Sequence, residues 1–267
     1  MSANPQASTA EPLLLRHDDD GVVTLTLNRP TQFNSLSHAL MSELQAELDR
    51  IAADAGARAV VLAGAGKAFC AGHDLKEMRS NPTKAFQRAL FDQCSKLMLT
   101  LVRMPQPVIA RVHGIATAAG CQLVSMCDLA VASDNARFAV SGVNLGLFCS
   151  TPSVGLARNL GRKQALEMLL TGDFIDAQAA LARGLVNRVV PLDQLDAEIK
   201  KLTDSILAKT PVAIKAGKQM FYRQLEMGLD EAYELASETM ACNMMAEDAQ
   251  EGIDAFVAKR KPEWKGR

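Results

Sequence analysis

The sequence lacks an excess of charge of either sign, because its 29 lysine and arginine residues stand against 30 aspartate and glutamate residues. This balance gives no electrostatic reason to expect binding to nucleic acid or another polyanion. The chain also lacks an apolar run that approaches the roughly 20 residues of a membrane-spanning helix. Hydrophobic residues make up 48% of its 267 positions, which is ample for a buried core. We therefore predict a globular protein with neither a nucleic-acid nor a membrane partner.

Paired cysteines and targeting signals are also missing. The six cysteines form no C-x-x-C pair and do not combine with the four histidines at metal-ligand spacing, so we expect free thiols and no metal site. The first residues, MSANPQASTAEP, lack the basic start and apolar stretch of a secretory signal and the arginines of a mitochondrial presequence. We expect residues 1–12 to be a disordered leader. The predicted location is cytoplasmic, or mitochondrial for a mature eukaryotic form.

What is present is a regular alternation of strand and helix patterns, which is typical of an α/β fold. Residues 13–30, LLLRHDDDGVVTLTLNRP, predict a hairpin with a DDDG turn. Ser37 is placed to cap a helix whose apolar residues follow a 3.6-residue period. Further strands are predicted at 59–64, 108–114, 129–133, 137–140 and 186–190, with helices between them.

The chain changes character after Leu192, where apolar residues recur three and four apart and no further strand pattern is found. We predict an α/β core over residues 13–200 and a helical region over residues 201–267. Large apolar side chains between residues 220 and 245 exceed what a thin covering layer needs, so this region is expected to mediate self-association.

Two predicted strands end in small residues that lead into a helix. One is FCAGHDLKEM, residues 69–78, and the other is HGIATAAGCQL, residues 113–123. The N–H groups at a helix start are free, and the helix dipole favours negative charge there. Two such starts side by side can present their amides to one oxygen and so stabilise an oxyanion. Ordinary strand-to-helix connections produce the same local pattern, so the turns alone do not decide.

Several separated motifs, in order, resemble the enoyl-CoA hydratase/isomerase, or crotonase, family over about residues 13–264. They are NRP with NSLS, FCAGHDLKEM, PVIARVHGIATAAGCQL, CDLAVAS, LLTG, GLVN and EGIDAFVAKRKPEW. The resemblance implies a crotonase-like spiral of ββα units and a homotrimer, or dimer of trimers, formed through the C-terminal helices. It also implies acyl-CoA thioester substrates, with coenzyme A as part of the substrate and no further cofactor.

The same resemblance assigns roles to particular residues. The family's two oxyanion-hole donors correspond to the backbone N–H groups of His73 and Ala119. Its coenzyme A contacts correspond to Leu75, Lys76, Phe256 and Lys259, of which the last two would reach the nucleotide of a neighbouring subunit.

The two glutamates that hydratases of this family use are replaced by Gln122 and Gly142. An amide does not titrate near pH 7 and glycine has no side chain, so neither position can supply the general acid or base of hydration. Polar groups on the loop of residues 140–153 are candidates to replace them. Among these, Cys149 falls near the loop tyrosine of decarboxylases in the family, although no activating base is evident.

The leading hypothesis is an enoyl-CoA hydratase-like enzyme that stabilises a thioester enolate and hydrates simple enoyl-CoA poorly. Two alternatives stay open: a decarboxylase of malonyl-type acyl-CoA, and a non-catalytic acyl-CoA binding protein. On the leading hypothesis, replacing Gln122 and Gly142 together by glutamate should raise hydration, provided that the loop accommodates the second side chain.

Overall fold

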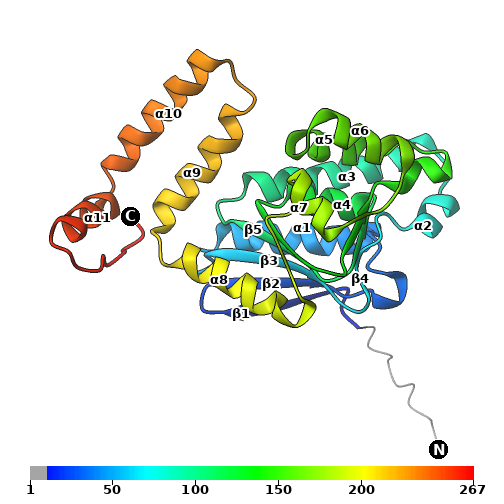
Figure 1. Ribbon diagram of the computed structural model, residues 1–267, viewed down its shortest axis with the longest axis horizontal. Helices are drawn as coiled ribbons and strands as arrows, with labels where there is room; N and C mark the ends of the chain where they lie inside the picture. The colour runs from blue at the N-terminus through cyan, green and yellow to red at the C-terminus, as the bar shows by residue number, and fades with distance from the viewer. Residues whose placement is uncertain (1–10) are drawn as a thin grey trace, which may run out of the picture.

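The computed structural model describes residues 11–267, so the predicted leader lies almost wholly outside the described residues. Two sheets form the body of the molecule (Figure 1). The larger has the order β1-β2-β3-β5-β7-β10, and the smaller has the order β4-β6-β8-β9. The strands of the larger sheet are β1 (Leu14–Asp19), β2 (Val22–Leu27), β3 (Ala59–Gly64), β5 (Val108–Val112), β7 (Leu129–Ser133) and β10 (Arg188–Val190). Those of the smaller sheet are β4 (Ala68–Cys70), β6 (Ile115–Thr117), β8 (Arg137–Ala139) and β9 (Ile175–Asp176).

The N-terminal hairpin is formed as predicted. Its two-residue turn has positive φ at Asp20 (44°) and Gly21 (80°), a conformation that suits the twist of the paired strands. On β2 the side chains of Val23, Leu25 and Leu27 are buried, and the intervening residues are half-buried. β1 pairs antiparallel with β2, and every other neighbouring pair in the larger sheet is parallel.

The pairs β3–β4, β5–β6 and β7–β8 each place one strand in the larger sheet and the next in the smaller sheet before a helix follows, which is the expected ββα repeat. The helices up to the end of the repeat are α1 (His38–Ala53), α2 (Leu75–Ser80), α3 (Lys84–Arg103), α4 (Ala119–Met126), α5 (Ser150–Asn159), α6 (Arg162–Thr171) and α7 (Ala177–Arg183). Ser37 caps α1 by accepting a hydrogen bond from Leu40 N, as predicted. Because β4 and β6 are parallel neighbours, the turns that follow them lie at the same edge of the smaller sheet.

The main core lies between the larger sheet and the helices α1 and α3, and includes the apolar stripe of α1. On the opposite face, α8 (Leu195–Leu207) covers β3, β5 and β7 through Leu195 and Ile199. The boundary predicted at residue 200 therefore falls within α8, a helix that packs on the core. Short 3-10 turns, η1 (Pro30–Gln32), η2 (Ser141–Leu145) and η3 (Leu192–Gln194), complete the connections.

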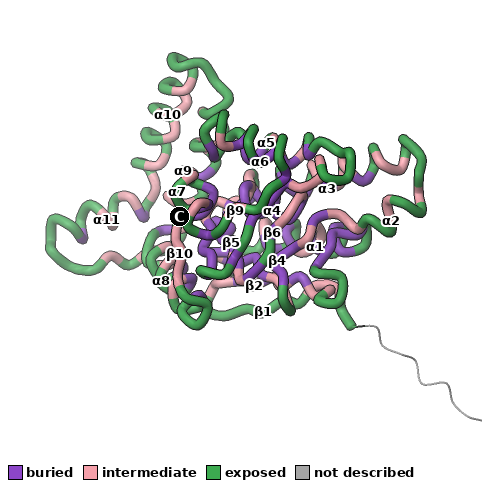
Figure 2. Tube along the Cα trace, turned by 45° about the vertical axis from the view of Figure 1, so that its right-hand side comes forward, coloured by how far each residue is buried: buried purple, intermediate pink, exposed green. Residues whose placement is uncertain are grey.

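The last three helices, α9 (Pro211–Gln224), α10 (Leu229–Met244) and α11 (Glu247–Val257), extend from one side of this body (Figure 1). α9 and α10 form a helical hairpin, and α10 has no buried residue. Figure 2 shows α10 and α11 as mostly exposed, in contrast to buried strands such as β4 and β5. No helix among the described residues is both long and apolar enough to cross a membrane.

Candidate active site

The turn after β4 is built from Gly72, His73 and Asp74. Gly72 has φ 91°, and a Cβ there would lie 2.8 Å from the Ala118 Cβ, so the position favours glycine. Asp74 caps α2 by accepting hydrogen bonds from the N–H groups of Lys76 and Glu77.

Two residues of the NRP and NSLS motifs hold this turn in place. The Arg29 guanidinium donates to Asp74 Oδ2 at 2.9 Å. Asn34 is fully buried and donates to the carbonyl oxygens of Ala65, Ala68 and Phe69, which ties the NSLS segment to β4 and to the loop before it. Burial acts to raise the pKa of the Asp74 carboxyl, but hydrogen bonds from Arg29 and from the start of α2 hold that pKa below its ordinary value.

The turn after β6 is unusually tight. Ala118 has φ 50° and ψ −120°, a conformation that L-residues rarely adopt. Gly120 lets α4 approach β4 closely, since a Cβ there would lie 2.0 Å from the Cys70 carbonyl oxygen. Ala118, the strained residue, stands directly before Ala119, the first residue of α4.

The two turns touch, and both leave a backbone donor free. A Cβ on Gly72, the residue before His73, would lie 3.1 Å from Ala119 N. Within residues 11–267, neither the His73 N–H nor the Ala119 N–H donates to a protein acceptor. The parallel bridge between Leu36 and His73 uses the neighbouring groups, Gly72 C=O and Asp74 N–H, and leaves the His73 N–H unused. Two unused amides thus lie side by side at one sheet edge.

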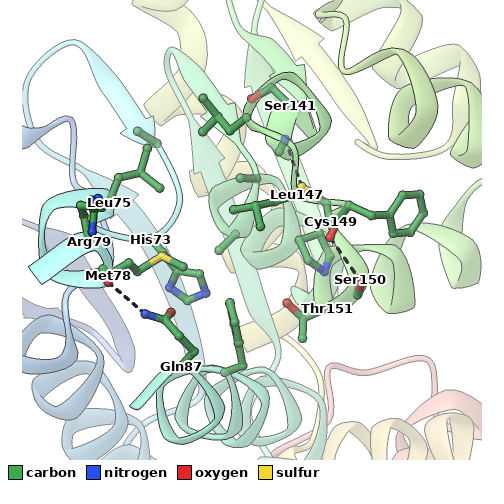
Figure 3. A pocket seen from close by; sticks show the side chains of 18 of the residues that line it. His73, Leu75, Met78, Arg79, Gln87, Ser141, Leu147, Cys149, Ser150 and Thr151 are labelled. Atoms are coloured by element: carbon green, nitrogen blue, oxygen red, sulfur yellow. Dashed lines mark hydrogen bonds between the residues drawn. The ribbon is translucent and has the colours of Figure 1, made fainter. Parts of the chain in front are cut away.

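Both turns line a cavity of about 1500 Å³. Its wall is mainly apolar, which suits an acyl chain, and it brings together six of the predicted site residues: His73, Leu75, Lys76, Ala119, Gly142 and Cys149. Figure 3 shows His73, Met78 and Gln87 on one side of this cavity and Cys149, Ser150 and Thr151 on the other. Leu75 and Lys76 are exposed residues of α2, at the edge of the cavity.

The His73 imidazole lies against the cavity wall formed by α3. It makes an edge-to-face contact with Phe91, with 5.4 Å between ring centroids. Both ring nitrogens are buried and have no hydrogen-bond partner among the described residues. Burial lowers the pKa of His73 to about 4, so the ring is neutral at pH 7.

The space beside Gly142, where the family resemblance led us to expect a missing glutamate, is closed by the chain itself. A Cβ on Gly142 would lie 2.6 Å from the Leu147 carbonyl oxygen and 2.7 Å from Cys149 Sγ. The Gly142 N–H also donates to Cys149 Sγ at 3.3 Å, and burial raises the pKa of this thiol. A glutamate therefore does not fit at position 142 without a shift of backbone. We expected replacement of Gln122 and Gly142 by glutamate to raise hydration only if the loop could accommodate the second side chain. The loop as it stands does not accommodate it.

Three predicted site residues do not line the cavity. Gln122 is 4% exposed and is not among the residues that line the cavity, and its Oε1 is buried and unpaired among the described residues. Phe256 and Lys259 lie at the end of α11 and just after it, outside the lining set, and Phe256 is 84% exposed. Their predicted contact with a neighbouring subunit's nucleotide stays a prediction.

Sequence reasoning missed Gln87 and Phe91 on α3, which both line the cavity. Their spacing of four residues places them on one helix face, but that spacing matches an ordinary core-facing stripe. Thr151, one of the polar residues of the 140–153 loop and the second residue of α5, also lines the cavity. Among the described residues, no group of three or more histidine, cysteine, aspartate or glutamate side chains is placed to hold a metal ion.

The family model for "Enoyl-CoA hydratase/isomerase" matches residues 17–267. The chain belongs to this family. The resemblance inferred from the sequence motifs is thus confirmed. Mouse enoyl-CoA hydratase domain-containing protein 3, mitochondrial, is 44% identical over 264 residues, which cover 98% of this chain and 88% of that protein. The 2,3-dehydroadipyl-CoA hydratase of Escherichia coli is 37% identical over 252 residues, covering 92% of this chain and 96% of that protein.

Solved structures of the enoyl-CoA hydratase/isomerase family share the fold. Enoyl-CoA hydratase of Mycobacterium smegmatis has a TM-score of 0.94 and 59% identity, covering 95% of this chain and 99% of that chain. Human enoyl Coenzyme A hydratase domain-containing protein 3 has a TM-score of 0.92 and 43% identity, covering 95% of this chain and 100% of that chain. The predicted crotonase-like α/β fold is confirmed.

Proposed function

We propose that the protein is an acyl-CoA enzyme that holds a thioester oxygen between the backbone N–H groups of His73 and Ala119. The observation that supports this proposal is the contact between the two turns, which leaves these donors unused at the wall of one apolar cavity. Transfer of an α-proton to a solvent water molecule, or loss of an α-carboxylate as CO₂, leaves the bonding electron pair on an enolate whose negative charge lies on the thioester oxygen. Preorganised amides stabilise that enolate without needing to titrate.

Hydration of a simple enoyl-CoA makes a further demand, because water must be deprotonated while a carbon is protonated. Gln122 is an amide that does not line the cavity, and the space at Gly142 is filled by the Leu147 carbonyl and the Cys149 thiol. Each general acid or base contributes about 10² to 10⁴-fold, so we expect crotonyl-CoA hydration to be slower by about 10⁴-fold or more than in a glutamate-bearing hydratase.

Closure at Gly142 also favours a second candidate function, namely acyl-CoA binding without turnover. The decarboxylase alternative needs a partner for the departing carboxylate. The cationic side chains that line the cavity, Lys76 and Arg79, are exposed residues of α2. We therefore rank the decarboxylase below the other two.

One experiment separates these functions. The protein is incubated in D₂O with butyryl-, crotonyl-, malonyl- and methylmalonyl-CoA, and products are read by mass spectrometry. Deuterium uptake at the α-carbon of butyryl-CoA without hydration of crotonyl-CoA is the expected result. Binding of every thioester with no exchange and no product would identify a non-catalytic binder, and loss of CO₂ from malonyl-type substrates would identify a decarboxylase. Failure to bind any thioester would contradict the proposed function.

A further inference from the structure

The Thr151 hydroxyl is open to the cavity. Thr151 is half-buried, and its hydroxyl has no hydrogen-bond partner among residues 11–267. Unlike the ring nitrogens of His73, the Thr151 oxygen is not one of the fully buried unpaired atoms, so it borders the cavity that Thr151 lines. Figure 3 shows this oxygen directed toward the cavity, from the side opposite His73. A ligand in the cavity can therefore reach it.

Three further hydroxyl-bearing side chains line the cavity, and each already has a partner within the chain. Ser80 and Ser150 donate to backbone carbonyl oxygens, and Ser141 is paired with the Thr117 hydroxyl at 3.0 Å. Among the described residues, Thr151 therefore offers the cavity its one side-chain hydroxyl without an internal partner.

The partner of this hydroxyl bears on selectivity, because a few polar groups in a mainly apolar pocket fix which ligands fit. Water serves as the partner of an accessible hydroxyl until a ligand displaces it. An alkyl chain packed against Thr151 displaces that water and leaves the hydroxyl unpaired, which weakens binding. A ligand oxygen at the same place restores the hydrogen bond, so the two kinds of acyl chain differ in affinity.

The charges around the cavity favour an uncharged oxygen at Thr151. A threonine hydroxyl donates one hydrogen bond and accepts others, so it matches a hydroxyl or a keto oxygen. A carboxylate needs a cation or several donors to offset its loss of hydration. The cationic side chains that line the cavity, Lys76 and Arg79, are exposed residues of α2. Figure 3 shows Arg79 across the cavity from Thr151.

We propose that Thr151 is a specificity-determining residue that binds an uncharged oxygen of the acyl chain and so selects hydroxy- and oxoacyl-CoA over alkyl- and carboxyacyl-CoA. This inference rests on the proposed function, since it places the acyl group in the cavity. The thioester oxygen is then held by the amides of His73 and Ala119, and a second oxygen is held on the opposite side. Two anchors fix the direction of the acyl chain. Thr151 acts on binding and transfers no proton.

The test compares five-carbon acyl-CoA thioesters by isothermal titration calorimetry. The series is pentanoyl-CoA, glutaryl-CoA, 4-oxopentanoyl-CoA and the 2-, 3- and 4-hydroxypentanoyl-CoA isomers. At least one uncharged oxygenated analogue should bind the wild type about tenfold more tightly than pentanoyl-CoA, which corresponds to about one net hydrogen bond. Glutaryl-CoA should not share this gain.

Thr151→Val keeps nearly the same shape and removes only the hydroxyl. It should lose the preference and bind pentanoyl-CoA at least as tightly as the wild type does. Thr151→Ser restores a hydroxyl and should keep the preference. Ser150→Ala is the matched control, because Ser150 also lines the cavity but its hydroxyl donates to the Phe148 carbonyl oxygen at 3.3 Å. It should keep the preference as well.

Two results would overturn the inference. One is a wild type that binds pentanoyl-CoA as tightly as every oxygenated analogue, and the other is a preference that Thr151→Val retains. Absence of pentanoyl-CoA binding to the wild type would instead overturn the proposed function.

Discussion

Position 142 has no room for a side chain, because the loop closes over the space that a Cβ would take. The Leu147 carbonyl and the Cys149 thiol occupy that space, and the Gly142 N–H is bonded to the same sulfur. Gln122 is buried and does not line the cavity. At the scale of single residues, the site is therefore organised around backbone donors and neutral side chains.

Gly142→Ala should destabilise the protein by about 1 to 3 kcal/mol, since overpacking forces backbone or sulfur to move. Gly217→Ala in α9 is the control, because a Cβ there meets nothing within 4 Å and alanine favours helix. Urea unfolding measures both. A Gly142→Ala protein as stable as the wild type would show that the loop yields easily, and would reopen the case for restoring hydration with glutamate.

Stability should depend on pH through His73. The folded pKa of about 4 lies below the ordinary value of 6.5, so the unfolded chain binds more protons between these values. The contribution of the neutral His73 ring to the free energy of unfolding is fully present above pH 6.5, and it is lost as pH falls from 6.5 to 4. A difference of this size amounts to about 3 kcal/mol.

The free energy of unfolding of the wild type should therefore fall more steeply over that window than that of His73→Phe. Denaturant titrations at pH 4, 5, 6 and 7 compare the two proteins. Parallel pH profiles would mean that the ring titrates as it does in the unfolded chain.

At the scale of elements, α9 is attached to the body by a buried ion pair. Lys218 Nζ donates to Asp128 Oδ2 at 2.6 Å and to the carbonyl oxygens of Leu101 and Gln106. Asp128 Oδ1 accepts from the Tyr222 hydroxyl. Burial lowers the pKa of Lys218 and raises that of Asp128, so each charge depends on the other.

Lys218→Met should lower the free energy of unfolding by about 3 to 5 kcal/mol, because it leaves the Asp128 carboxylate buried without its counter-ion. Lys215→Met, at an exposed position one turn earlier, should change stability by less than about 0.5 kcal/mol. Thermal and urea unfolding give both values. Equal, small effects would show that water replaces the ammonium group.

Most elements followed from the sequence, because each carries its own signal. The alternation of Val23, Leu25 and Leu27, the Ser37 cap and the glycine at 184 that ends α7 are local features. The backbone donors could be placed only through family resemblance. The closure at Gly142 and the contact of His73 with Phe91 depend on tertiary packing that no local pattern encodes.

At the scale of the whole molecule, the C-terminal helices expose an apolar stripe. On α10, Leu229, Tyr233, Met240 and Met244 are 73%, 68%, 64% and 47% exposed. Their spacing of four, seven and four residues places them on one helix face. A helix with no buried residue gains little from its own subunit, so we expect this face to be covered by another copy of the chain.

Tyr233→Glu combined with Met240→Glu should shift the protein from oligomer to monomer, because charge on the stripe opposes apolar burial. Glu234→Gln, at an exposed position on the same helix, is the control and should leave the oligomer intact. Sedimentation velocity reports the mass. A wild-type protein that is monomeric at micromolar concentration would contradict the expectation.

The central claim is that one thioester oxygen is shared by two backbone amides, and a crystal structure with acetoacetyl-CoA bound tests it most directly. We predict that the thioester oxygen lies about 2.7 to 3.1 Å from both His73 N and Ala119 N. An oxygen bound elsewhere in the cavity, or amides that point to protein carbonyls when the ligand is present, would contradict the account.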